Sequence, residues 1–136
     1  MNTDIKHIAA LVATTIWADG EYDEAEKIVV GEIAEAFELN AVEFAAAVEA
    51  ELAVVESMNE EDVNAYILEH SAEVEDDEAE MLLQAVLQVV IVDGVLGEDE
   101  VENVLSIASA LGINESRAVL MLADVVKEEP ELQVEL

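Results

Sequence analysis

Cysteine is absent from this 136-residue chain, and lysine and arginine together contribute only four residues. Without cysteine, the chain can form no disulfide, present no thiolate nucleophile and offer no cysteine ligand to a metal. Against the four basic residues stand 34 aspartates and glutamates, so the formal net charge is −30. Nucleic acids and anionic membrane surfaces are bound mainly through lysine and arginine. The composition therefore excludes both as partners and leaves divalent cations and basic proteins.

Proline and glycine are also scarce, with a single proline, Pro130, and five glycines. Hydrophobic residues nevertheless make up 54% of the chain, which is enough for the core of a folded domain. They recur at intervals of three and four residues, as is typical of helices, and strands have almost no support. The apolar runs at residues 8–18 and 82–92 are shorter than the ~20 residues that span a bilayer. We therefore expect an all-α, cytoplasmic protein.

The two halves of the chain resemble each other. Shifting the sequence by 74 positions aligns residues 7–40 with residues 81–114 without a gap, and ten of the 34 aligned pairs are identical. Ten of the other 24 pairs match one apolar residue with another. A unit of this length that occurs twice indicates a duplicated three-helix unit within one domain.

We predict a seven-helix bundle built from two pseudo-symmetric three-helix repeats joined by a linking helix. A single domain covers residues 1–128, with repeat one at about 3–57, the linking helix at about 59–73 and repeat two at about 77–128. The other predicted helices cover residues 4–18, 24–37, 41–57, 78–92, 98–111 and 115–128, and the predicted caps are Asn40, Asn59 and Asn114.

The apolar faces of these helices predict how they pack. The helices at 4–18 and 78–92 are apolar on nearly every side and should lie at the centre. The others carry one stripe each, such as Ile28, Ile33, Ala36 and Phe37, or Val63, Tyr66, Ile67 and His70. The acidic tail at 129–136 should leave the bundle as a frayed terminus.

Two acidic segments stand out, at residues 19–26 and 93–100. Each joins a central helix to an acidic helix, and each has an Asp-Gly pair followed by glutamates five and seven positions after the aspartate. Helix capping accounts for much of this pattern, because Asp23 and Glu26 have the spacing of a capping box. Acids in a first helical turn also gain about 0.3–1 kcal/mol each from the helix dipole.

Asp19 and Asp93 are harder to explain by capping, because each lies at the C-terminal end of a helix, where the dipole disfavours an anion. A hard cation such as Ca²⁺ or Mg²⁺ would offset that cost, since it takes carboxylate and carbonyl oxygens as ligands. The alternative is local, with each aspartate bonded to backbone N–H groups of its own turn. The segments are not EF-hand loops, which need acids at alternate positions before the glycine.

The chain resembles the TerB-like family, named for a tellurite-resistance protein and related to the N-terminal domain of the membrane-anchored co-chaperone DjlA. The resemblance is carried by Ala18-Asp19-Gly20 with Glu26 and by Val92-Asp93-Gly94 with Glu100. The hydrophobic runs before both segments and the Leu39-Asn40 and Ile113-Asn114 turns after them also match, so the resemblance covers nearly the whole chain. It departs at Gly97, which stands where the first segment has Asp23.

This resemblance implies an all-helical module with two similar halves that binds divalent cations in metal or chemical stress, of which tellurite is one example. The implied metal ligands are Asp19, Glu26, Asp93 and Glu100, with Asp23, Glu24 and Glu98 as further contributors. We expect no organic cofactor and, because of self-repulsion at this net charge, a monomer. The alternative is an acidic helical scaffold that docks a basic protein, with both Asp-Gly turns purely structural.

We expect the protein not to be an enzyme. None of its serines lies in a Gly-x-Ser-x-Gly elbow, and the chain has no His-Glu-x-x-His zinc motif or paired Glu-x-x-His motif. The two histidines, His7 and His70, each stand alone in the sequence. Since His70 lies on an apolar stripe, it is interpreted as a core histidine and not as a metal ligand.

Overall fold

The computed structural model describes residues 4–19, 22–92 and 94–135. These residues are 77% helical and form seven α-helices and one 3₁₀ turn, which confirms the predicted all-α bundle. The helices are α1 (Ile5–Asp19), α2 (Glu24–Ala36), α3 (Ala41–Glu56), α4 (Glu60–Ser71), α5 (Ala79–Ile91), α6 (Glu98–Ala110) and α7 (Glu115–Glu128). A short 3₁₀ turn, η1 (Asp76–Glu78), leads into α5, and two three-residue strands, β1 (Val95–Gly97) and β2 (Gln133–Glu135), complete the fold.

Asparagine side chains fix the starts of three helices, as predicted. Asn40 Oδ1 accepts from Glu43 N at 3.0 Å, and Asn59 Oδ1 accepts from Asp62 N at 2.8 Å. Asn114 Oδ1 accepts from Ser116 N at 2.8 Å at the start of α7. Each bond satisfies a backbone N–H that has no partner within the helix, which is why these helices begin where they do.

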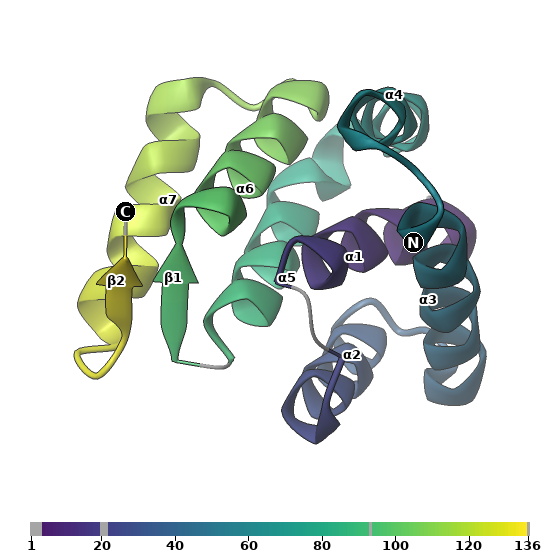
Figure 1. Ribbon diagram of the computed structural model, residues 1–136, viewed down its shortest axis with the longest axis horizontal. Coiled ribbons are helices and arrows are strands. Elements are labelled where there is room, and N and C mark those ends of the chain that lie inside the picture. The colour runs from purple at the N-terminus through teal and green to yellow at the C-terminus, as the bar shows by residue number, and fades with distance from the viewer. Residues whose placement is uncertain (1–3, 20–21, 93, 136) are drawn as a thin grey trace.

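Helix α1 is the centre of the bundle. Every residue from Ile8 to Ile16 is at most 1% exposed, including two threonines. Figure 1 places α1 between α5 and α3, with α6 and α7 beyond α5. Helix α5 buries Leu82, Leu83, Val86 and Val90 but exposes Gln84 and Gln88, so it is less central than its composition predicts.

The predicted stripe on α2 is partly wrong. Ile28 is 63% exposed and Ala36 is also exposed, whereas Ile33 and Phe37 are buried as expected. The buried stripe instead contains Glu26, Val29 and Val30. At about 100° per residue, Ile28 falls on the opposite side of the helix from Val30, so only one of them can face the core.

The tail does not leave the bundle as predicted. Strand β2 pairs in parallel with β1, with Val95, Leu96 and Gly97 opposite Gln133, Val134 and Glu135. Gln133 N also donates to Gly94 O at 2.9 Å. Two sequence features explain this return of the chain. Pro130 lacks a backbone N–H and prevents α7 from continuing, and Leu132 then packs against the core. Figure 1 shows the resulting two-stranded ribbon beside α7.

Among the described residues, no helix combines the length and the apolar character that a bilayer crossing needs.

Candidate functional site

The first acidic turn joins the end of α1 to the start of α2. Asp23 is the N-cap of α2, and its Oδ1 accepts from Glu26 N at 3.2 Å. The predicted capping role of Asp23 is therefore confirmed. Glu24, the first residue of α2, is exposed and lies with its Oε1 3.8 Å from Lys27 Nζ, which makes a surface ion pair of little energetic value.

Glu26 is the unusual residue of this turn, because its side chain is completely buried. Tyr22 lies near it, and the pKa of the Tyr22 phenol is raised, first by burial and then by the negative charges of Glu49 and Glu26. The Lys27 ammonium lies 5.6 Å from the centre of the Tyr22 ring. The turn therefore combines a buried carboxylate with a half-buried phenol on a surface that is otherwise acidic.

The second acidic turn joins α5 to α6 and is built differently. Gly97 is the N-cap of α6. It has no side chain that could cap the helix, and its backbone N–H donates to the Glu100 side chain instead. Glu100 Oε1 accepts from Gly97 N at 3.3 Å, as in one half of a capping box. A Cβ atom at position 97 would lie 3.3 Å from Glu100 Oε1, so the missing side chain leaves room for this carboxylate.

Backbone geometry and the tail further distinguish the second turn. Gly94 has φ +81, a left-handed conformation that glycine adopts without strain. Its carbonyl accepts from Gln133 N, so the C-terminal strand holds this turn in place. Leu96, within β1, is only 2% exposed and anchors the turn to the core.

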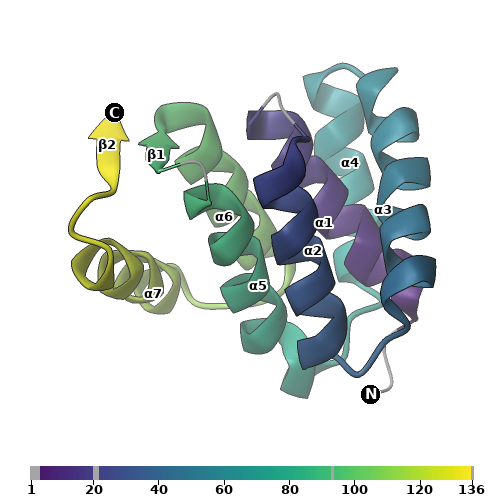
Figure 2. The same cartoon turned by 90° about the horizontal axis from the view of Figure 1, so that it is seen from below.

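Glu26 and Glu100 occupy matching places in the two turns. Each is the third residue of its helix, and Glu100, at 8% exposed, is nearly as buried as Glu26. The first turns of α2 and α6 lie at the same end of the bundle, as Figure 2 shows. The N-terminal ends of these helices favour a negative charge there. Two carboxylates are thus held at the start of two helices with little contact with solvent.

The remaining predicted ligands are Glu98, Asp19 and Asp93. Glu98 is exposed in the first turn of α6. Asp93 and the side chain of Asp19 lie outside the described residues. Within the part of the chain that the structure describes, no group of three or more histidine, aspartate or glutamate side chains is arranged to hold a metal ion.

The sequence analysis missed one contact between two side chains. His7 and His70 were expected to stand alone, but His7 Nδ1 lies 2.8 Å from His70 Nδ1, across α1 and α4. His70 is 5% exposed, which confirms its interpretation as a core histidine. The two residues are 63 positions apart, and no local motif connects them, so the sequence carries no signal for this contact.

The fold and the two turns define an acidic all-α bundle in which two helices each begin with a buried glutamate. The sequence profile of the family described as Tellurite resistance protein TerB matches residues 6–123, which is well over half of the chain. The chain therefore belongs to the TerB family, as its Asp-Gly segments predicted. No curated protein and no solved structure matches it.

Proposed function

We propose that this TerB-family chain is a non-enzymatic module that binds divalent cations, Ca²⁺ or Mg²⁺, at its two acidic turns. Asp19 and Glu26 are the principal ligands of one turn, and Asp93 and Glu100 those of the other. Asp23, Glu24 and Glu98 contribute further oxygens. In the cell the module would serve the response to metal or chemical stress, of which tellurite is the example in the family's name.

The burial of Glu26 and Glu100 is the observation that carries this proposal. Removing a carboxylate from water as an anion costs several kcal/mol, which hydrogen bonds, ion pairs or a bound cation must offset. A cation at each turn would offset that cost directly. Carboxylate oxygens are also the ligands that Ca²⁺ and Mg²⁺ prefer, and the chain has no cysteine that would favour a softer metal.

The first experiment is calorimetric titration of chelator-treated protein with Ca²⁺ and with Mg²⁺ at physiological salt. We expect saturable binding of one or two ions per chain, which the double substitution Asp19→Asn/Asp93→Asn abolishes. Glu26→Gln/Glu100→Gln should have the same effect, because glutamine keeps the size of the side chain but not its charge.

A matched control separates local ligation from the general charge of the surface. Glu43→Gln/Glu61→Gln removes the same charge from exposed first-turn positions of α3 and α4. It should leave ion binding unchanged. Two results together would contradict the proposal: binding heats that never saturate, and an equal change of these heats in both pairs of substitutions. They would indicate a diffuse counterion cloud.

In the alternative function the chain is an acidic scaffold that docks a basic protein, and its acidic turns are structural, as the capping bonds favour. Asp23 and Glu100 both cap their own helices, so part of the acidity of the turns has a structural purpose. In that case Asp19→Asn/Asp93→Asn would leave partner binding nearly intact, because the charge that attracts the partner is spread over many residues.

A further inference from the structure

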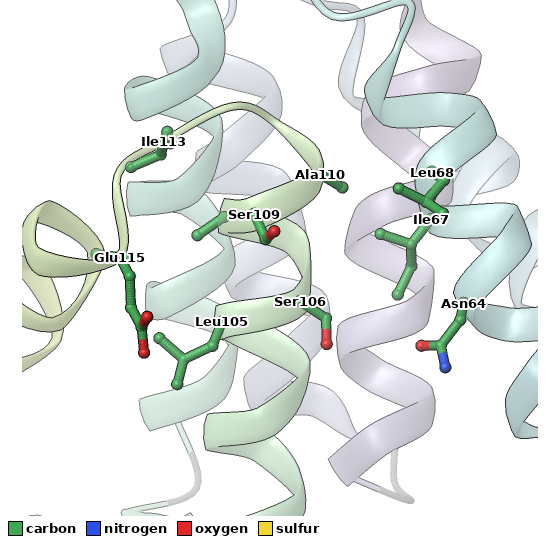
Figure 3. Close-up of a pocket in the computed structure, with 11 residues that line it drawn as sticks. Asn64, Ile67, Leu68, Leu105, Ser106, Ser109, Ala110, Ile113 and Glu115 are labelled. Atoms are coloured by element: carbon green, nitrogen blue, oxygen red, sulfur yellow. The ribbon is translucent and has the colours of Figure 1, made fainter.

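Helix α6 forms the floor of a hollow of about 500 Å³ between α4 and α7. Figure 3 shows Asn64, Ile67 and Leu68 of α4 on one side and Ile113 and Glu115 on the other. The floor between them contains the small residues Ser106 and Ser109, which are exposed, and Ala110, which is half-buried. Leu68, on the rim, is 61% exposed. This end of the surface is therefore a hollow with small residues on its floor, and Leu68 and Ile113 lie at its edges together with the polar Asn64 and Glu115.

A second hollow, of about 600 Å³, continues the first toward the start of α6. The two share Asn64, Leu105 and Ser106, so they form one groove along α6, which we call the α4–α6 groove. The character of the groove changes along its length. At its second end the lining contains three exposed carboxylates, Glu60, Asp99 and Glu102, and the ring of Trp17.

The charges of the groove restrict what can occupy it. The described lining contains no lysine or arginine, so the three carboxylates at one end have no positive counterpart within it. An aromatic ring beside carboxylates suits a lysine or arginine side chain, through charge attraction together with a cation–π contact. The opposite end has one exposed carboxylate, Glu115, and the apolar side chains of Leu68 and Ile113, which suit large apolar side chains of a partner.

The dimensions of the groove also favour one form of occupant. Helix α6, with 13 residues, is about 20 Å long, and its small floor residues allow close approach of another helix. A partner helix of similar length would place basic residues at the acidic end and leucine-like residues at the apolar end.

We propose that the α4–α6 groove docks an amphipathic helix of a partner protein, with lysine or arginine residues over Glu60, Asp99 and Glu102 and large apolar residues against Leu68 and Ile113. The proposal assigns the docking of a basic protein, the alternative function given above, to a defined surface. It does not depend on cation binding by the acidic turns.

The test uses the full chain in chelator and a synthetic helical peptide without tryptophan. The peptide has about 14 residues, enough to match the length of α6, with arginines at one end and leucines at the other. A second peptide of the same composition has the arginines and leucines interspersed. Trp17, the only tryptophan of the chain, reports binding by its fluorescence. Amide shifts of Ser106 and Ser109 report the location.

Three variants make the result specific. Glu60→Gln/Asp99→Asn/Glu102→Gln removes the charges of the groove, and Glu43→Gln/Glu56→Gln/Glu73→Gln removes the same number of exposed charges elsewhere. Ser109→Phe fills the apolar end from an exposed position, where the larger side chain should not prevent folding.

We expect the groove triple variant to weaken peptide binding about tenfold and the control triple less than about twofold, as three rim ion pairs would imply. Ser109→Phe should weaken it by a similar factor, and the interspersed peptide should bind less tightly than the first. Equal losses in the two triple variants would overturn the proposal in favour of diffuse attraction. Unchanged binding by Ser109→Phe, or equal binding of both peptides, would also overturn it. Cation titration in the absence of peptide tests the acidic turns separately.

Discussion

His7 Nδ1 and His70 Nδ1 lie 2.8 Å apart, which means that one ring donates to the other. Only one proton fits between two nitrogens at that distance. The contact joins the start of α1 to the end of α4. Tyr66 packs beside it, with its ring edge-on to that of His70 and the two ring centroids 4.4 Å apart. Tyr66 Oη in turn donates to Glu51 Oε1 of α3 at 2.5 Å. Three helices, α1, α3 and α4, therefore meet at one part-buried polar cluster.

This cluster predicts that acid destabilises the fold. The pKa of His70 is lowered, mainly by burial, then by the charge of His7 and weakly by Lys6, while Glu51 and Glu69 oppose the shift. A histidine whose pKa is lower in the folded than in the unfolded protein stabilises the fold at pH values above its ordinary pKa of about 6.5. This stabilisation is lost as the pH falls through the lowered pKa. Urea unfolding of the wild type should therefore give a lower free energy of unfolding at pH 5 than at pH 7.5.

His70→Asn should reduce this pH dependence, and a double-mutant cycle with His7→Asn should give a coupling energy of about 1 kcal/mol at pH 7.5. The test compares the pH dependence of the free energy of unfolding in the wild type with that in the variants. Identical pH profiles for both would contradict the prediction.

We predict that the backbone of Glu38 is strained and that glycine at this position would stabilise the fold. It has φ +57 after the end of α2, and Gly112 has φ +78 after the end of α6. Both turns close in the same way, because Leu39 N donates to Ala34 O and Ile113 N donates to Ala108 O. A residue with a Cβ pays about 1 kcal/mol in this conformation, so Glu38→Gly should raise the free energy of unfolding by about that amount.

Two substitutions serve as controls for the Glu38 prediction. Glu38→Ala removes the same charge but keeps the Cβ, so it should give no comparable gain. Gly112→Ala should destabilise by about 1 kcal/mol in the same urea unfolding assay. A gain from Glu38→Ala as large as that from Glu38→Gly would point to relief of charge repulsion instead of backbone strain.

The backbone bond from Gln133 to Gly94 should hold the second acidic turn in place. Gln133→Pro removes the N–H that donates to Gly94 O, whereas Gln133→Ala keeps it. Amide hydrogen exchange at β1 should therefore accelerate in the proline variant and stay near the wild-type rate in the alanine variant. Equal exchange in the two variants would mean that β2 does not stabilise the turn.

Cation binding, as proposed, should appear as a gain in thermal stability. A ligand that binds only the folded state stabilises it by about 2.7 kcal/mol at one hundred times its dissociation constant. The melting temperature of the wild type should rise with Ca²⁺ or Mg²⁺ concentration, and that of Glu26→Gln/Glu100→Gln should not. An equal response to the cation in both proteins would exclude these glutamates as ligands.

The sequence by itself determined the helices. Apolar spacing, the three asparagine caps and the scarcity of glycine and proline act over a few residues, so they predicted all seven helices to within a residue or two of their ends. The same local patterns located the Asp-Gly segments and led to the TerB family, which the family profile then matched. The assignment of the acidic turns as cation ligands remains a prediction, because Asp93 and the side chain of Asp19 lie outside the described residues.

Only the tertiary structure decided which distant residues meet. The pairing of His7 with His70, the return of β2 to β1 and the α4–α6 groove each join segments far apart in the chain. The burial of Glu26 and Glu100 likewise depends on neighbouring helices, since a first-turn glutamate is usually exposed. Local sequence patterns fix backbone hydrogen bonds within one turn or helix, whereas these contacts depend on how whole helices pack against α1.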